Sequence, residues 1–315
     1  MKYVYGPIPS RRLGQSLGID PIPFKTCNWN CVYCQLGRTA PMTNTRREYA
    51  PPDAILAEAG AALAAHPPGT VDWVSFVGSG EPTLHSAIGR MIREVKALTS
   101  IPVAVITNGA LLYLPEVRED LRAADAVMPT LVAGEERLFR RITRPWPELT
   151  FERLLGGLID FRRAYTGRLW VEVMLIRGMN DTEAALLTLA TALKRVGPDA
   201  IHLTLPDRPP AEPWVRPPDQ EGLLRATAIL GALAEIVPPS GGDVDLSGCQ
   251  DAADAALAVI MRHPIREADL RRALGRWAPD QVAEALQRLA AGGHARLVMR
   301  YGQRFWSYAG ARYAD

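Results

Sequence analysis

Residues 17–34 read LGIDPIPFKTCNWNCVYC and place a short apolar run directly before three cysteines. The run LGIDPIPF (17–24) has the length and aliphatic content of a buried β-strand. Cys27, Cys31 and Cys34 follow in the spacing CxxxCxxC, and they are three of only four cysteines in the chain. Three thiolates at this spacing can converge on one metal centre from a loop. The stretch therefore predicts a strand that delivers a metal-binding loop at its carboxyl end.

Strand and helix patterns alternate beyond this stretch. The further strand candidates lie at 72–78, 103–108, 126–131, 169–176 and 200–206. The clearest amphipathic helical patterns lie at 53–66, 87–98, 151–165, 182–196 and about 219–236. This alternation predicts an α/β protein with a parallel sheet and crossover helices. Periodicity leaves two architectures open, a flat doubly wound sheet and a barrel-like curl of six βα units.

A change of rhythm near residue 240 predicts a second domain. We assign residues 1–240 to the α/β domain, 241–250 to a linker and 251–315 to a small C-terminal domain. Three helical patterns in this last segment precede an alternating stretch that turns near Tyr301–Gly302. Three helices and a hairpin are typical of a winged-helix module. Its ten arginines against seven acidic residues include three in the expected wing, Arg296, Arg300 and Arg304, which are suited to phosphate.

The bulk composition excludes several classes of protein. Of 315 residues, 48% are hydrophobic and 22% are charged, which is typical of a globular protein. No apolar run approaches the roughly 20 residues of a membrane span, and the N-terminus is too polar for a signal peptide. We therefore expect a cytoplasmic protein with no membrane partner. The formal net charge of +2 indicates no strong general attraction to nucleic acid.

The three cysteines could belong to a structural zinc site or to an iron–sulfur site. A zinc site wants four ligands, usually in two pairs, and no second pair exists because the fourth cysteine, Cys249, lies far away in sequence. A cubane iron–sulfur cluster also takes four ligands, so three cysteines would leave one iron open to an outside ligand. The incomplete iron–sulfur site is the favoured interpretation, with a zinc site or a chance cluster as alternatives.

The motif CxxxCxxC, with Tyr33 before the last cysteine and a predicted strand before the first, resembles the radical S-adenosylmethionine (SAM) superfamily. The resemblance implies an open partial (βα)6 TIM-like barrel with a [4Fe–4S] cluster on Cys27, Cys31 and Cys34. It implies that SAM binds the open iron and is cleaved reductively to a 5′-deoxyadenosyl radical, which abstracts hydrogen from the substrate. It also implies an external one-electron reductant of the flavodoxin or ferredoxin type.

The resemblance further implies SAM contacts at the strand ends. The stretch VGSGEPTL (77–84) is similar to the family's GGEP motif, with Ser79 in place of a glycine and Glu81 as acceptor for the methionine ammonium group. The stretch TNG (107–109) is similar to a second family motif, and Thr130 matches a serine near the SAM ribose, although Val132 replaces an aspartate expected there. The implied contacts are Tyr33, Gly78, Ser79, Gly80, Glu81, Thr107, Asn108, Thr130 and Glu172. Arg11, Arg12 and Arg144 are candidate anion contacts.

Longer stretches, among them RITRPWPELTFERLLGGL and HLTLPDRPPAEPW, resemble the branch of radical SAM proteins similar to the tRNA wyosine (imidazo-guanine) synthesis enzymes. This resemblance covers roughly residues 3–215 and implies modified tRNA as the substrate. Two departures leave that substrate open: no cysteine precedes Cys27 to hold the additional cluster of the tRNA enzyme, and the C-terminal module is extra. The module favours a maturase or activase that acts on a docked peptide or protein. A non-enzymatic iron–sulfur redox regulator that binds DNA is a third hypothesis, and catalytic residues stay unassigned.

Overall fold

The computed structural model of the chain describes residues 2–10, 12–238, 246 and 249–314. These residues form one eight-stranded sheet in the order β1-β2-β3-β4-β5-β6-β7-β8. Its strands are β1 (Val4–Ser10), β2 (Gly14–Ile19), β3 (Trp73–Phe76), β4 (Val103–Thr107), β5 (Ala126–Pro129), β6 (Arg168–Met174), β7 (Ala200–Thr204) and β8 (Ala234–Ile236). Strands β2 to β8 run parallel, whereas β1 is antiparallel to β2. The sequential order excludes the doubly wound alternative, in which the strand order reverses.

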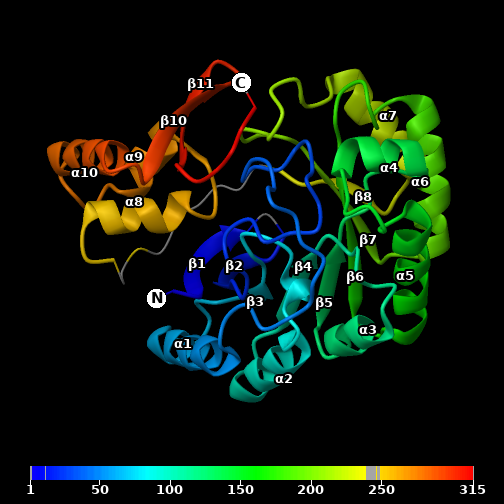
Figure 1. The fold of residues 1–315 in the computed structure, drawn as a ribbon, viewed down its shortest axis with the longest axis horizontal. Helices are drawn as coiled ribbons and strands as arrows, with labels where there is room; N and C mark the ends of the chain where they lie inside the picture. Colours follow the sequence, from blue (N-terminus) through cyan, green and yellow to red (C-terminus); the bar gives the residue numbers. More distant parts are fainter. Residues whose placement is uncertain (1, 11, 239–245, 247–248, 315) are drawn as a thin grey trace.

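Helices connect the parallel strands and surround the sheet from outside (Figure 1). They are α1 (Pro52–Ala65), α2 (Ile88–Leu98), α3 (Pro115–Leu121), α4 (Glu136–Thr143), α5 (Phe151–Ala164), α6 (Glu183–Val196) and α7 (Gln220–Leu230), with a short 3-10 turn η1 (Pro82–Leu84). The threonine caps Thr150 and Thr182 fix the starts of α5 and α6, because their hydroxyls accept from backbone N–H groups of the first turn.

The two faces of the sheet differ in character, as β6 shows. Leu169, Val171 and Val173 are fully buried in the core between the sheet and the helices. Trp170 and Glu172 alternate with them and therefore face the other way. Residues of β2, β3, β4, β6 and β7 all line one cavity on this inner face, so the sheet curls around it. A barrel-like curl of parallel strands was one of the two architectures left open by the sequence.

The sheet has two strands that the sequence pattern did not predict. Strand β1 precedes β2, so the cysteine loop follows the second strand and not the first. Strand β8 occupies residues that the helical pattern of 219–236 assigned to a helix, which ends at Leu230. Gly231, with a positive φ of 82°, allows the chain to leave that helix. The strands β1 and β8 are the two edges of the sheet as described.

The C-terminal segment forms a separate small core beside the N-terminal strands (Figure 1). Its elements are α8 (Ala252–Ile260), β9 (Ile265–Arg266), α9 (Glu267–Ala273), α10 (Pro279–Ala291), β10 (Ala295–Arg300) and β11 (Gln303–Tyr308). The strands form an antiparallel sheet in the order β10-β11-β9. Tyr301 and Gly302 turn the hairpin with φ values of 52° and 72°, as a tight two-residue turn requires. Most of the expected linker, 241–250, lies outside the described residues.

Among the described residues, no helix combines the length and the apolar character that a membrane span requires.

Candidate functional site

The cysteine loop after β2 is anchored by the apolar residues between its cysteines. Trp29 and Val32 are 1% and 0% exposed, and the Trp29 ring packs edge-on against Phe139 with centroids 5.5 Å apart. The backbone N–H of Val32 also donates to the carbonyl of Ile142 at the end of α4, at 2.9 Å. Apolar burial therefore fixes the loop. The three cysteine thiols are free and partly buried.

Burial controls the electrostatics of these thiols. It raises the pKa of Cys27 to about 12 and that of Cys31 well above its usual range. Lys25 supplies a positive charge, with its Nζ donating to the Sγ of Cys34 at 3.1 Å. Burial acts to lower the pKa of Lys25, but the nearby Cys34 and Cys27 sulfurs outweigh it and raise that pKa. The hydroxyl of Tyr33, the aromatic residue in the motif, hydrogen-bonds with the Cys31 side chain.

The donor set fits an iron–sulfur cluster better than a single ion. Within residues 2–314 as far as they are described, no three His, Cys, Asp or Glu side chains are placed to hold one metal ion. Three partly buried thiols on one loop are the ligand set that a cubane cluster with one open iron takes. Thiols whose pKa is raised by burial also need a metal to take up their charge when they ionise. The residues present therefore fit a cluster held by three cysteines.

The turn Gly78–Glu81 after β3 packs directly on the cysteine loop. A side chain at Gly80 would collide with the carbonyl oxygen of Thr26, the residue before Cys27. A side chain at Gly78 would come within 2.6 Å of a carboxylate oxygen of Asp20. Ser79 donates to Asp20 from its hydroxyl at 2.8 Å, and its carbonyl accepts from the Lys25 N–H at 2.6 Å. The close approach that requires these glycines is thus an approach to the cysteine loop.

Glu81 connects the ends of β3 and β4 from within the protein. Its side chain is 2% exposed, and burial raises its pKa although several hydrogen bonds act in the opposite direction. One carboxylate oxygen accepts from the hydroxyls of Thr83 and Thr107, both at 2.6 Å, and from the Thr83 N–H. The other accepts from the Asn108 N–H at 2.6 Å. The predicted contact of this carboxylate with an ammonium group stays a prediction.

Asn108 points from the end of β4 toward the cysteine loop. Its amide Nδ2 donates to the Asn28 side chain at 2.7 Å and lies 3.8 Å from the Sγ of Cys27. Its Oδ1 accepts from the Ala110 N–H, which makes a turn that side-chain amides commonly form. The motifs at 78–81 and 107–108 are therefore brought together around the first cysteine.

Thr130, the residue directly after β5, forms an isolated β-bridge with Glu172 on β6. The Glu172 carboxylate forms an ion pair with Arg12, which the β1–β2 hairpin carries into the sheet interior. Arg11 lies outside the described residues. Arg144, the remaining candidate anion contact, has its guanidinium 2.5 Å from the carboxylate of Glu212, which also accepts from Arg38. Both described arginine candidates therefore already face a carboxylate of the protein.

A cavity of about 310 Å³ opens on the inner face of the sheet next to the last cysteine. Tyr33, Cys34 and Glu172 line it, so these three predicted residues share one hollow. Gln35, Arg208 and His263 also line it, together with Arg12. The sequence pattern did not single out Gln35, Arg208 or His263 for this site. Only the position of Gln35, directly after Cys34, could have pointed to one of them.

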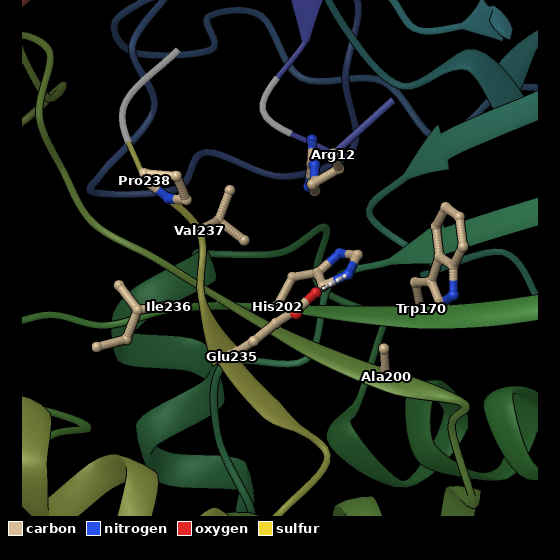
Figure 2. A pocket seen from close by; sticks show the side chains of 8 residues that line it. All are labelled: Arg12, Trp170, Ala200, His202, Glu235, Ile236, Val237 and Pro238. Atoms are coloured by element: carbon tan, nitrogen blue, oxygen red, sulfur yellow. Dashed lines mark ion pairs between the residues drawn. The ribbon is translucent and has the colours of Figure 1, made fainter. Parts of the chain in front are cut away.

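A second hollow of about 300 Å³ lies between β8 and the hairpin that carries Arg12 (Figure 2). His202 stands in its centre and its Nε2 lies 3.0 Å from the Glu235 carboxylate. Burial, assisted by the charge of Arg12, lowers the pKa of His202. In the part of the chain that is described, the buried Nδ1 of this ring has no hydrogen-bond partner. Arg12 lines both hollows and so lies between them.

Comparison with known proteins gives matches in sequence and in structure. The sequence model of the radical SAM superfamily matches residues 22–190. A UPF0026 protein of Methanocaldococcus jannaschii is 34% identical over 285 residues, which are 88% of this chain and 87% of that protein. A protein named GTPase Obg of Brachyspira hyodysenteriae is 42% identical over 207 residues. That match covers 66% of this chain but 30% of the relative.

Among solved structures, a radical SAM methyltransferase from Sphaerobacter thermophilus has a similar fold. Its TM-score is 0.53 at 21% sequence identity, over 70% of this chain and 66% of that chain. At this level of identity the likeness concerns the fold alone.

Proposed function

The chain belongs to the radical SAM superfamily and is an enzyme, and from this premise we propose that Cys27, Cys31 and Cys34 hold its [4Fe–4S] cluster. Proteins of this superfamily bind SAM and a [4Fe–4S] cluster. The observation that carries the proposal is the donor set itself: three partly buried free thiols on one anchored loop, the last of which lines a cavity. When bound, the cluster and SAM supply a 5′-deoxyadenosyl radical by one-electron reductive cleavage, and the radical abstracts hydrogen from the substrate.

We propose that residues at the cysteine loop and residues that line the cavity hold different parts of SAM. The turn Gly78–Glu81 and Asn108 meet at the cysteine loop, so their backbone and amide groups would hold the methionine end. Thr130, just after β5, is bridged to Glu172 on β6, and Glu172 lines the cavity, so these two residues would hold the ribose. Tyr33 would lie against the adenosyl part from the cluster side.

For the substrate we propose modified tRNA, on the strength of the resemblance to the wyosine branch. A cavity of about 310 Å³ suits a single extruded base, because enzymes that act on a base take it out of the stack into a pocket. An external one-electron reductant of the flavodoxin or ferredoxin type would supply the electron. We interpret the C-terminal unit, with three helices and a hairpin sheet, as a winged-helix-like module.

A peptide or protein substrate, as in a maturase or activase, is the second candidate. The observation that favours it concerns the arginines of the wing, which were expected to contact phosphate. Arg296 and Arg300 donate to backbone carbonyls of the chain's own residues 311 and 314, and Arg304 pairs with Glu267 at 3.0 Å. Gel shifts with bulk tRNA and with copurifying peptides, each at several salt concentrations, separate the two candidates. Salt-dependent binding of tRNA favours the tRNA substrate, and binding of the peptides alone favours the peptide or protein substrate.

Anaerobic reconstitution with iron and sulfide tests the proposed reaction. With dithionite and SAM the protein is expected to release 5′-deoxyadenosine, and SAM is expected to change the electron-spin spectrum of the reduced cluster. Cys31→Ala should abolish both signals, whereas Cys249→Ala, which removes the cysteine outside the loop, should keep them. Absence of both signals in a fully loaded wild-type protein would refute the assignment.

A further inference from the structure

The C-terminal unit is attached to the α/β domain at several places. The hydroxyl of Tyr301, in the turn of the hairpin β10–β11, donates to the carbonyl of Val215 at 3.2 Å. The hydroxyl of Tyr313 donates to the carbonyl of Gln35, next to the last cysteine, at 2.7 Å. Helix α8 lies beside β1 (Figure 1), and Arg262 follows the end of this helix. The unit therefore reaches the first strands of the main sheet as well as the cysteine loop.

Tyr5 connects Arg262 to strand β2. The guanidinium of Arg262 lies over the Tyr5 ring, 4.1 Å from its centroid, which is a cation–π contact. Tyr5 on β1 is the partner of Gly18 on β2 in the antiparallel pair. A side chain at Gly18 would come within 2.2 Å of the Tyr5 ring carbon that carries the hydroxyl. The ring therefore fills the space above Gly18 and holds the charge of Arg262 close to β2.

The positive charge of Arg262 has no counter-ion in direct contact. Within the described parts of the chain, no carboxylate forms an ion pair with this guanidinium. Its Nη1 donates to the neutral carbonyl of Ala258 at 3.3 Å, and its buried Nε has no hydrogen-bond partner among the described residues. The charge can therefore act on a negative group beyond the Tyr5 ring.

Asp20 is the negative group on which this charge acts. It comes two positions after Gly18, so the two residues face the same side of the sheet. Burial raises the pKa of Asp20, whereas the hydrogen bond from Ser79 and the charge of Arg262 act to lower it. Burial also raises the pKa of Tyr5, the charge of Asp20 raises it further, and that of Arg262 lowers it. Both charges thus lie near the same ring.

The Asp20 carboxylate holds the turn Gly78–Glu81 through one residue. One of its oxygens accepts from the Ser79 N–H at 3.1 Å and from the Ser79 hydroxyl at 2.8 Å. Asp20 and Ser79 are 9% and 7% exposed, so water competes little for these bonds. Hydrogen bonds to an ionised acceptor are stronger than those to a neutral one. A glycine in place of Ser79 would supply only the N–H, so the serine adds the second bond to Asp20.

We propose that Arg262 is a positioning residue for the turn Gly78–Glu81. Its positive charge strengthens the hydrogen bonds by which the Asp20 carboxylate holds Ser79 in this turn. The inference rests on the proposed function, because that function assigns the turn to the methionine end of SAM. It makes the affinity of the α/β domain for SAM depend on a residue of the C-terminal unit.

Binding of SAM to the oxidised, cluster-loaded protein tests this proposal, because SAM is not cleaved unless an electron is added. Arg262→Met is expected to raise the Kd for SAM about three- to tenfold, which corresponds to the usual coupling between groups in one hydrogen-bond network. SAM carries a net positive charge, so the mere loss of a cation from the protein would lower the Kd instead. Titration calorimetry without oxygen measures the constants.

Two further variants serve as controls for the charge. Arg262→Lys keeps the positive charge and is expected to bind SAM as the wild type does. Arg272→Met removes an arginine of the same unit whose side chain is 73% exposed, and it should also leave the Kd unchanged. An unchanged Kd in Arg262→Met, or an equal rise in Arg262→Lys, would overturn the proposal.

The Asp20→Asn background shows whether the effect passes through Asp20. An asparagine keeps an oxygen that can accept from Ser79 but carries no charge on which Arg262 could act. Arg262→Met is therefore expected to leave the Kd unchanged in this background. A loss of affinity that came only from looser packing of the C-terminal unit would persist there, and the proposal would fall.

Hydrogen exchange of residues 78–81 gives a readout that needs neither SAM nor the Asp20 variant. In the SAM-free protein, Arg262→Met is expected to speed exchange in this turn, because the bond from the Ser79 N–H to Asp20 is weakened. Exchange in α5 is the internal control and should not change. Exchange at 78–81 as slow as in the wild type would overturn the proposal. A wild type that fails to bind SAM, combined with faster exchange in Arg262→Met, would count against the proposed function alone.

Discussion

Glu81 shows how one side chain of a predicted ligand site can also hold the site together. Its carboxylate accepts four hydrogen bonds that connect the turn after β3 with the end of β4. This buried carboxylate accepts with both oxygens, and the groups around it act as donors. Replacing it by an amide would put N–H hydrogens where one of its oxygens accepts, against these donors.

Glu81→Gln is therefore expected to destabilise the cluster-free protein by about 1–3 kcal/mol for each buried donor that is left without an acceptor. Urea unfolding of the variant and the wild type measures the difference. Glu94→Gln is the matched control, because Glu94 is 46% exposed and forms a surface pair with Arg90, which is expected to contribute little to stability. Equal midpoints for the Glu81 and Glu94 variants would contradict the role of Glu81.

Lys25 is expected to set the potential of the cluster through its charge. Its ammonium group donates to the Sγ of Cys34, and a positive charge close to the cluster favours the reduced, more negative state. The attraction of two unit charges about 4 Å apart is on the order of 4 kcal/mol at an effective dielectric near 20. Lys25→Met should therefore lower the midpoint potential in a spin-monitored titration, and Lys25→Arg should keep it. A potential that is unchanged in Lys25→Met would rule this role out.

At the level of single residues, site residues within short motifs could be predicted from the sequence. Residues that only the fold brings to the site could not. The cysteine spacing and the motif Gly78–Glu81 lie within short stretches, so their patterns are visible without a fold. His263 comes to the cavity from 228 positions beyond Gln35, and no local pattern distinguishes it from a surface histidine. Arg12 looked like an anion contact, but the fold places Glu172 against it.

At the level of elements, Glu212 joins three segments of the chain. It lies in the loop after β7 and pairs with Arg38 beyond the cysteine loop and with Arg144 after α4. Its side chain is 5% exposed. Burial alone would raise its pKa, but the hydrogen bonds from Arg38 and Arg144 outweigh this and hold it below 4.5.

This pairing predicts a stability that depends on pH. The pKa of Glu212 is lower in the folded protein than the unfolded value of about 4.5. Its contribution to the free energy of unfolding is therefore fully present above pH 4.5 and is lost as the pH falls through the folded pKa. Glu212→Gln should therefore lower the urea midpoint at pH 7, and the gap to the wild type should close in acid. A gap that stays constant between pH 7 and about pH 3 would exclude the ion pairs as its cause.

Six of the eight strands in the main sheet follow from the sequence, and the reasons are physical. Strands β2 to β7 are short aliphatic runs followed by helical periodicity, and burial on both faces favours such runs. Strand β1 reads VYGPIPS, in which glycine and two prolines hide the strand signal. Strand β8 has only three residues, and two of them are exposed, so apolar content could not reveal it. The ends of elements differ by a few residues, as is usual where helices fray.

At the level of the whole molecule, the hairpin β10–β11 of the C-terminal unit contacts the α/β domain through Tyr301 at its turn. Arg296, Arg300 and Arg304 were expected to contact nucleic acid. Their side chains instead donate to backbone carbonyls of the same unit or pair with Glu267. Phosphate contacts make the logarithm of the binding constant for nucleic acid fall linearly with the logarithm of the salt concentration, and the slope grows with the number of contacts. These arginines are therefore expected to add little to such a slope.

We predict that the triple variant Arg296→Ala, Arg300→Ala, Arg304→Ala changes the salt slope of tRNA binding by less than about one. Its main effect should be a lower thermal midpoint, since it removes bonds that hold the wing to the following segment. Arg272→Ala, a variant at a mostly exposed arginine on α9, is the control for loss of charge. A slope that falls by about three would show that the wing contacts phosphate.

The contact of Tyr313 with Gln35 bridges 278 positions of the chain, and this has a consequence for biosynthesis. Residues 35–38, next to the last cysteine, are made long before residues 312 and 313, which bond to them. Until those partners exist, the backbone of residues 35–38 lacks these hydrogen bonds, so this part of the loop is expected to become ordered late. A chain truncated before residue 309 is therefore expected to show faster hydrogen exchange at residues 35–38 than the longer chain.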